Sequence, residues 1–191
     1  MSRHDMFTRL HVAGFFQGHE ISRAPDPEYV PQRMSGTLPG FHVLQIGPGP
    51  QTSGWAYVTQ GLCQTTLADG DGLELCLVSP EPDARNVECL FMLGDYLVEK
   101  VSTVHFGQTF DIGAPWLSGL MTHLLLSKPY PFGPDLEIAK RPSGYVHHLW
   151  VLPIHKAEAD FLHECGDLDA LEDRFDVAGI DYLDPWRAAV V

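Results

Sequence analysis

The densest group of chemically reactive side chains lies in the stretch GYVHHLWVLPIHKAEADFLHECG, residues 144–166. It contains four histidines and one cysteine. Both residue types bind transition metals, and both act in acid–base or nucleophilic catalysis. The apolar pattern predicts a strand over residues 145–152 and a helix over residues 156–165. These two elements would decide whether the side chains can share one ion.

Neither element brings its metal-binding residues together. Adjacent side chains on a strand point to opposite faces, so His147 and His148 cannot approach one ion from the same side. His155 and His163 would lie about 12 Å apart along a helix, whereas zinc ligands on one helix lie one turn apart. His163 and Cys165 diverge around the helix by about 200°. We therefore expect satisfied or exposed histidines, with no resident metal and no cofactor.

Other signatures of catalysis are missing from the sequence. There is no G-x-S-x-G nucleophile elbow, no P-loop and no G-x-G-x-x-G motif, and GDG at residues 70–72 predicts a turn. Cys63 and Cys165 lack an activating context and are predicted to be reduced thiols in the core. We expect a protein that is not an enzyme. The open alternative is a metal-dependent hydrolase that uses His148, His163 and Cys165 with ligands from elsewhere in the chain.

Composition and charge narrow the class of partner. The chain has 191 residues, 45% of them hydrophobic, which is typical of one folded domain with a sizeable core. Its 25 acidic residues against 12 basic ones give a formal charge of −13, which would repel a phosphate backbone. We therefore expect no nucleic-acid partner. The acidic charge serves either solubility alone or attraction to a basic protein. Neither a signal peptide nor a membrane span is recognisable, so a cytoplasmic location without membrane contact is expected.

Apolar periodicity predicts most elements of the first half. A short helix is expected over residues 5–17, and an extended, proline-rich segment over residues 22–40. Strands are expected at residues 41–46, 54–62 and 72–78, and the short turns between them favour antiparallel pairing. In the third strand, leucines alternate with Glu74 and Cys76. This alternation predicts one face on a core and the other toward solvent or a thin covering layer.

The second half is predicted to contain the longest helix, further strands and two terminal helices. The long helix is expected over residues 84–101, with Asp83 as its cap. Gly94 lies in its middle, which predicts close approach to a neighbouring strand. Two further segments are strand candidates, and two C-terminal helices are bounded by Gly166, Asp167 and Gly179. The strand candidates are residues 119–127 and 144–152, and the helices are residues 156–165 and 168–178.

Aromatic residues occur unusually often near the predicted turns. They are Trp55, Tyr57, Trp116, Tyr130, Phe132 and Trp186. Amphipathic aromatics anchor protein interfaces, so this pattern fits a binding protein better than an enzyme, and Trp116 is one candidate contact with a partner. The alternative is that these rings pack in the core.

Seven stretches together resemble the suppressor-of-fused domain family, in its stand-alone bacterial form, over residues 41–191. They are FHVLQI, GWAYVTQGL, GLELCLV, CLFMLGDYLVEK, HFGQTFDIG, HHLWVLPIHKAEADF and LEDRFDVAGIDYLDPWRAAVV. The resemblance implies an α/β fold, a single-domain α/β/α sandwich with a mixed, largely antiparallel sheet and helices on both sides. Residues 1–40 would then be an N-terminal helix and a proline-rich wrapping segment of the same domain.

The resemblance also implies a non-catalytic, protein-binding role. Metazoan relatives clasp a short peptide of a transcription factor between this domain and a second one, which we expect to be missing here. They place a tyrosine of the long helix, and an acidic residue after the following glycine, near that peptide. Tyr96 matches the first, and Gln108 replaces the second. Tyr96, Gln108 and Trp116 are therefore the candidate partner-binding residues, with packing as the alternative.

Bacterial members of the family are often interpreted as immunity proteins that neutralise toxins. The acidic charge suits that role, because complementary fields speed association with a basic protein. A housekeeping scaffold with a fixed partner is the other protein-binding hypothesis.

Overall fold

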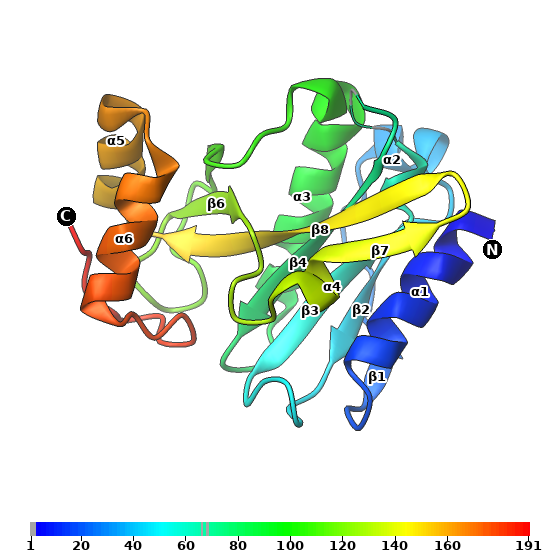
Figure 1. Ribbon diagram of the computed structural model, residues 1–191, viewed down its shortest axis with the longest axis horizontal. Helices are drawn as coiled ribbons and strands as arrows, with labels where there is room; N and C mark the ends of the chain where they lie inside the picture. Colours follow the sequence, from blue (N-terminus) through cyan, green and yellow to red (C-terminus); the bar gives the residue numbers. More distant parts are fainter. Residues whose placement is uncertain (1–2, 66, 68) are drawn as a thin grey trace.

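The centre of the fold is an eight-stranded mixed sheet (Figure 1). The computed structural model describes residues 3–65, 67 and 69–191. The strand order is β1-β2-β3-β4-β8-β6-β5, and β7 pairs with β8 outside this path. Only β4 and β8 are parallel among the described pairs, so the sheet is largely antiparallel. The strands are β1 (Ile21–Arg23), β2 (His42–Ile46), β3 (Trp55–Gln60), β4 (Gly72–Ser79), β5 (Thr109–Asp111), β6 (His123–Ser127), β7 (Ile138–Arg141) and β8 (Gly144–Ile154).

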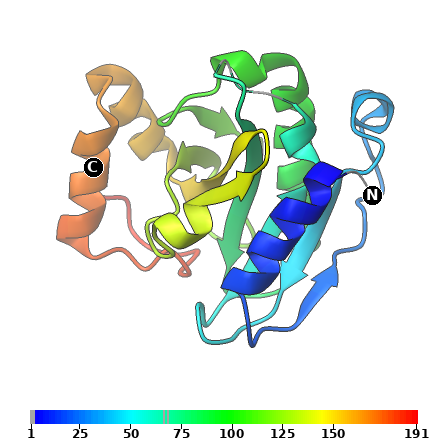
Figure 2. The same ribbon diagram turned by 45° about the vertical axis from the view of Figure 1, so that its right-hand side comes forward.

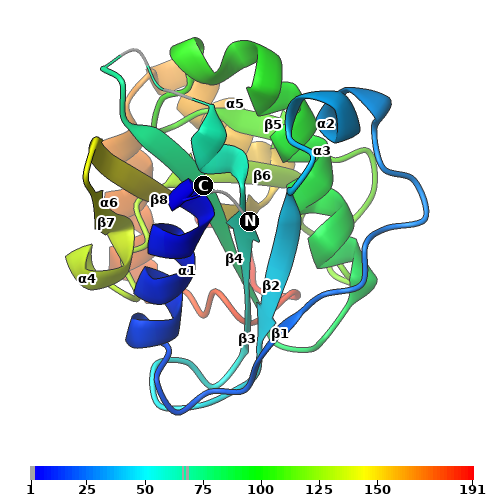
Figure 3. The same ribbon diagram turned by 90° about the vertical axis from the view of Figure 1, so that its right-hand side faces the viewer.

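Helices cover both faces of this sheet, which confirms the predicted α/β/α sandwich (Figure 3). One face carries α2 and α3. The opposite face carries α1 and α4 toward one end and α5 and α6 toward the other (Figure 2). The helices are α1 (Arg3–Phe15), α2 (Gln32–Thr37), α3 (Ala84–Lys100), α4 (Pro134–Glu137), α5 (Lys156–Cys165) and α6 (Leu168–Ala178), with short 3-10 turns at Leu62–Gln64 and Val101–Thr103.

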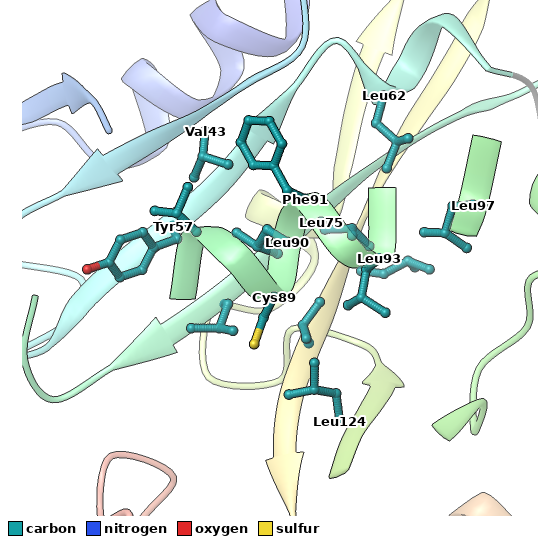
Figure 4. Close-up of a cluster of buried hydrophobic side chains, with 14 of the residues drawn as sticks. Val43, Tyr57, Leu62, Leu75, Cys89, Leu90, Phe91, Leu93, Leu97 and Leu124 are labelled. Carbon is teal, nitrogen blue, oxygen red and sulfur yellow. The ribbon is translucent and has the colours of Figure 1, made fainter. Parts of the chain in front are cut away.

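The alternation in β4 separates two cores. Leu73, Leu75 and Leu77 face α3 in the larger core, part of which Figure 4 shows. Glu74 and Cys76 face the opposite side, where the side chains of α1 cover the sheet. All eight residues of β4 are buried. The second face of this strand therefore meets a covering layer and not solvent.

The long helix α3 begins where its cap was predicted, but its glycine has a different neighbour. The Asp83 carboxylate accepts a hydrogen bond from the backbone N–H of Arg85 at 2.7 Å, which confirms the cap. A Cβ on Gly94 would lie 3.0 Å from Cε of Met34 and 3.2 Å from Cζ of Phe41. Met34 belongs to α2, so the expected contact with a strand was wrong. The glycine instead lets α2, inside the proline-rich segment, approach α3 closely.

The two C-terminal helices have the predicted bounds, and a buried ion pair attaches the chain end to the first of them. Two nitrogens of the Arg187 guanidinium donate to the two carboxylate oxygens of Glu158, each at 2.7 Å. Both side chains are almost fully buried. A paired, bidentate geometry of this kind is what allows charges to be buried. Across the described part of the chain, no helix has the length and apolar character needed to cross a membrane.

Candidate functional site

Two of the three predicted partner-binding residues meet at the β5 edge of the sheet. The hydroxyl oxygen of Tyr96 on α3 accepts a hydrogen bond from Nε2 of Gln108 at 3.2 Å. The Tyr96 ring also packs edge-on against Phe110, with ring centroids 5.2 Å apart. Tyr96 remains 40% exposed, so one side of the ring is available to another molecule. The sequence alone placed these residues on different elements, and the fold brings them together.

A shallow groove of about 410 Å³ runs beside this pair. Its lining residues come from α3 and from the segment that contains β5, namely Met92, Leu93, Tyr96, Gln108, Thr109, Phe110 and Asp111. On either side of β5, backbone hydrogen bonds join the strand to β6 and the residue before it. The carbonyl oxygen of Gln108 accepts from the backbone N–H of Leu126, and the backbone N–H of Ile112 donates to the carbonyl oxygen of Thr122. Because hydrogen bonding alternates along an antiparallel strand, the backbone groups of Thr109 and Asp111 point away from β6, toward the open edge.

Trp116, the third candidate, lies in the core and not at this groove. Its side chain is fully buried, and Nε1 donates to Oδ1 of Asn86 on α3 at 2.9 Å. The Trp116 backbone N–H also donates to the carbonyl of Met121, which closes the loop before β6. The indole thus fixes that loop to α3, and a partner could reach it only if the loop opened. The role of Trp116 in this structure is packing.

The strand histidines lie on opposite faces, as the period of a strand predicts. Nε2 of His147 lies 3.3 Å from Oδ2 of Asp71, in the turn before β4. His148 is fully buried and stacks on the His11 ring of α1, with centroids 5.2 Å apart. Burial lowers the pKa of His148 to about 3, so this ring is neutral at physiological pH.

The remaining histidines and the cysteine of the opening stretch also have separate surroundings. Nε2 of His155 lies 2.8 Å from the Arg187 carbonyl oxygen, and Nε2 of His163 lies 2.7 Å from Oγ1 of Thr109. Cys165 is exposed, so its prediction as a core thiol was wrong, whereas Cys63 is buried. Cys165 ends α5 at the surface, just before the Gly166 cap. Among the described residues, no three His, Cys, Asp or Glu side chains are placed to hold a metal ion.

One carboxyl has the pKa of a general acid or base but lacks access to a substrate. Burial raises the pKa of Glu74 to about 7. Its Oε2 accepts from the Thr59 hydroxyl at 2.6 Å, and its Oε1 accepts from the backbone N–H groups of Gly61 and Cys63 at 2.9 and 3.1 Å. The side chain is 0% exposed beneath α1. Since general acid–base catalysis requires contact with the reacting group, this carboxyl serves the fold.

Sequence reasoning missed a second hollow, of about 640 Å³, between α6 and the end of the sheet. Trp150 of β8 and Tyr130 of the loop after β6 line it, together with acidic residues of α6. The signal was present in the sequence, since Asp169, Glu172 and Asp173 recur at the three- and four-residue spacing of one helix face. What the pattern could not indicate was which surface that face would meet.

The geometry defines a three-layer α/β domain whose candidate site is a groove at an edge strand. The family model described as Suppressor of fused protein (SUFU) matches residues 38–188, so the chain belongs to this family. The resemblance seen in the sequence is thereby confirmed.

Solved structures of relatives show the same fold. A crystal structure at 1.40 Å of a protein from Neisseria gonorrhoeae FA 1090, described as a SUFU homologue, is 32% identical with a TM-score of 0.83. The match covers 98% of this chain and 97% of that one. A Sufu–Fu complex structure has 14% identity and a TM-score of 0.65, over 94% of this chain and 89% of that chain. Drosophila Suppressor of Fused has 14% identity and a TM-score of 0.55, over 78% of this chain and 42% of that one. No curated protein matches the chain.

Proposed function

We propose that the chain is a non-catalytic, cytoplasmic protein-binding domain that takes an extended segment of a partner along the open edge of β5. The observation that carries this proposal is the pairing of Tyr96 with Gln108 beside outward-facing backbone groups of an edge strand. A strand edge supplies the main-chain hydrogen bonds of strand addition, and an exposed aromatic beside it supplies a contact for alternate side chains. Family membership also supports a protein-binding role, since one relative was solved as a Sufu–Fu complex.

The partner proposed here is a basic protein, and the most concrete form is a toxin that this chain neutralises as an immunity protein. The formal charge of −13 supports a basic partner, because complementary potentials raise association rates and disfavour acidic competitors. A housekeeping scaffold with a fixed partner is the competing form. The two differ in whether a gene beside this one encodes a toxic protein.

The first experiment pairs the purified protein with the product of each neighbouring gene, in a direct binding assay and in a test of cell survival. The proposal expects one basic product to bind with a Kd below about 1 μM, with protection of cells that express it. Binding without protection would favour the scaffold. If no product binds, the immunity hypothesis is wrong.

A matched pair of variants then locates the binding edge. Thr109→Pro removes the outward N–H that a partner strand needs, while leaving the hydrogen bonds to β6 in place. Thr109→Ala keeps that N–H. The proposal expects the proline variant to weaken binding at least about tenfold and the alanine variant less than about threefold. Equal binding by both variants would contradict strand addition at β5.

A further inference from the structure

One face of α6 presents four carboxylates to the hollow at the end of the sheet. Their spacing of i, i+3, i+4 and i+7 places them in one stripe, which consists of Asp169, Glu172, Asp173 and Asp176. Like charges four residues apart destabilise a helix. Within the described residues, none of the four forms an ion pair, and no lysine or arginine lines the hollow. The stripe therefore has an uncompensated negative potential that faces a concave surface.

The floor of this hollow is apolar and aromatic. It is formed by sheet residues that share one face, with Trp150 and Leu152 from β8 and Leu125 and Ser127 from β6. The Trp150 ring packs edge-on against Tyr182 at 5.5 Å between centroids, and Tyr130 also lines the hollow. Aromatic rings beside carboxylates form an environment that stabilises organic cations, through the ring quadrupole and through direct charge attraction.

Trp150 supplies a second, independent indication of a ligand. Its side chain is directed from the sheet face into the hollow and is only 6% exposed. In the part of the chain that the structure describes, its indole Nε1 is buried without a hydrogen-bond partner. A buried indole N–H normally finds an acceptor, and leaving it unpaired costs free energy. A ligand that brings an oxygen acceptor would remove that cost.

Glu172 is held in place at the wall of the hollow. Its two carboxylate oxygens accept hydrogen bonds from the hydroxyl groups of Ser127 and Tyr130, each at 2.6 Å. Both donors are neutral, so they orient the carboxylate without cancelling its charge. Each oxygen keeps a lone pair for another donor. Glu172 is thus a preorganised acceptor for a bidentate cation such as a guanidinium.

Two nearby arginines already have partners. The Arg174 guanidinium lies over the Phe161 ring, on the side of α6 toward α5, at 4.5 Å from the ring centroid. Arg187 is bound to Glu158. Neither residue is among those that line the hollow.

We propose that the hollow beneath α6 binds an arginine side chain of a protein partner, with its guanidinium on Glu172 and the carboxylate stripe and its backbone carbonyl on Nε1 of Trp150. The aliphatic stem would lie on the apolar floor, and the planar head would stack on the aromatic walls. Arginine fits better than lysine because its fork matches a carboxylate and stacks on rings. The charges select a basic segment, and the unpaired indole selects a peptide oxygen.

This site lies on the opposite face of the sheet from α3 and the Tyr96 ring, although Leu125 of its floor pairs with Thr109 of β5. The outward backbone groups of β5 are not part of the hollow, so the site can exist whether or not a partner binds β5. Thr109→Pro is expected to leave the arginine site intact, and changes beneath α6 are expected to leave the β5 edge intact. Failure of one site is therefore distinguishable from failure of the other.

The test uses the full chain, labelled with ¹⁵N, and follows the indole N–H resonances of its four tryptophans. The Trp150 signal is assigned by its loss in Trp150→Phe. The probe is N-acetyl-arginine N′-methylamide, which carries the guanidinium and two peptide carbonyls. Its citrulline analogue is the uncharged control with nearly the same shape, and ethylguanidinium is the control that lacks the carbonyls. We expect a saturable shift of the Trp150 resonance with the arginine probe, and affinity at least about tenfold weaker for both controls.

Variants test the carboxylates. Glu172→Gln keeps an acceptor for Ser127 but removes the charge, and Asp173→Asn removes a charge from the same stripe. Each is expected to weaken the arginine probe about three- to tenfold, whereas Glu164→Gln on α5 should change it less than about twofold. Thermal unfolding of each variant checks that the fold is retained.

Four results would overturn the proposal. Equal binding of the citrulline probe would show that charge does not select the ligand. Equal binding of ethylguanidinium would make the hollow a site for free organic cations and not for a peptide. Absence of a saturable Trp150 shift, or an effect of Glu164→Gln as large as that of Glu172→Gln, would place any binding elsewhere.

Discussion

Two contrasting carboxyl groups lie on the same side of the sheet, Glu74 of β4 beneath α1 and Glu172 on α6 itself. Glu74 accepts three hydrogen bonds and has no exposed surface. Glu172 accepts two from neutral hydroxyls and borders a hollow of about 640 Å³. The residues around Glu74 form a closed polar cluster, and those around Glu172 form an open one.

The difference follows from what each helix brings to the sheet. Val12 of α1 and Phe16, which directly follows this helix, pack on β3 and β4. The buried polar groups around Glu74 must therefore find their hydrogen-bond partners within the protein. Helix α6 also presents an apolar side, but its carboxylate stripe faces the end of the sheet, where aromatic rings line a gap. A closed cluster contributes to stability, whereas an open one is available for binding. Four measurements test this contrast.

The largest expected effect is on the free energy of unfolding when each carboxyl is truncated. Glu74→Ala leaves two buried N–H groups and the Thr59 hydroxyl without their acceptor, and it creates a cavity. We expect a loss of about 3 kcal/mol or more from these combined costs. Glu172→Ala should cost less than about 1 kcal/mol, because water can reach its partners. Urea unfolding compares the two, and similar losses would show that the clusters do not differ.

The second effect is on how stability depends on pH. The folded pKa of Glu74 is raised from 4.5 to about 7, so its contribution to stability is complete below pH 4.5 and is lost as pH rises to about 7. His148 has the opposite sign, since its pKa falls from 6.5 to about 3 and its neutral form is favoured as pH rises. Between pH 4.5 and 6.5 the two slopes oppose each other.

Single variants should separate these slopes. Relative to the wild type, Glu74→Gln should gain stability as pH rises from 4.5 to 6.5, by up to about 1.4 kcal/mol per pH unit. His148→Phe should lose stability over the same window by a similar amount, while keeping a ring to stack on His11. Urea unfolding at several pH values measures both differences. Slopes of the same sign in the two variants would contradict the assignment.

A smaller effect is expected when one hydroxyl donor to each carboxylate is removed. Thr59→Val deletes the donor to Glu74 and also the acceptor of the Leu75 backbone N–H, both buried. We expect a loss of about 2 kcal/mol. Tyr130→Phe deletes the donor to Glu172 from a ring that is 57% exposed, and it should cost less than about 1 kcal/mol. Thermal unfolding compares Thr59→Val with Tyr130→Phe. Equal losses of stability would show that the closed cluster around Glu74 and the open cluster around Glu172 do not differ.

The smallest effect, with no change in stability, concerns thiol accessibility. Cys165 is exposed, whereas Cys63, Cys76 and Cys89 are buried, and burial raises the pKa of Cys76 to about 12 and of Cys89 to about 11. In the folded protein, a thiol reagent should modify Cys165 alone within minutes, and the Cys165→Ser variant should not react. Rapid reaction of more than one thiol would show that the core around α1 or α3 opens.

Much of the fold was predictable, because it depends on contacts within a few residues. The helices α5 and α6 have the predicted bounds, since Asp167 caps the second and Gly166 and Gly179 adopt the left-handed conformation that ends each. The helix α3 begins after Asp83 for the same local reason. The strand β7 and the short helices α2 and α4 were missed, because their sequences are too short to show a period.

The candidate site was only partly predictable. Tyr96 and Gln108 were matched through family resemblance, and the fold places them within hydrogen-bond distance. Trp116 was chosen as an aromatic near a predicted turn, with packing as the alternative, and its indole donates to Asn86 on α3 and is buried. Residue type and a nearby turn cannot indicate which side of a loop faces the core.

The sequence by itself determined the elements with strong local patterns, their caps, and the opposite orientation of His147 and His148, since these follow from periods of about two and 3.6 residues. Only the tertiary structure decided that α1 closes the surroundings of Glu74, that Gly94 accommodates Met34, and that the acidic stripe of α6 faces Trp150. Each of these depends on segments far apart in the chain. Their contacts result from how the apolar faces of all the elements pack together, which no local pattern encodes.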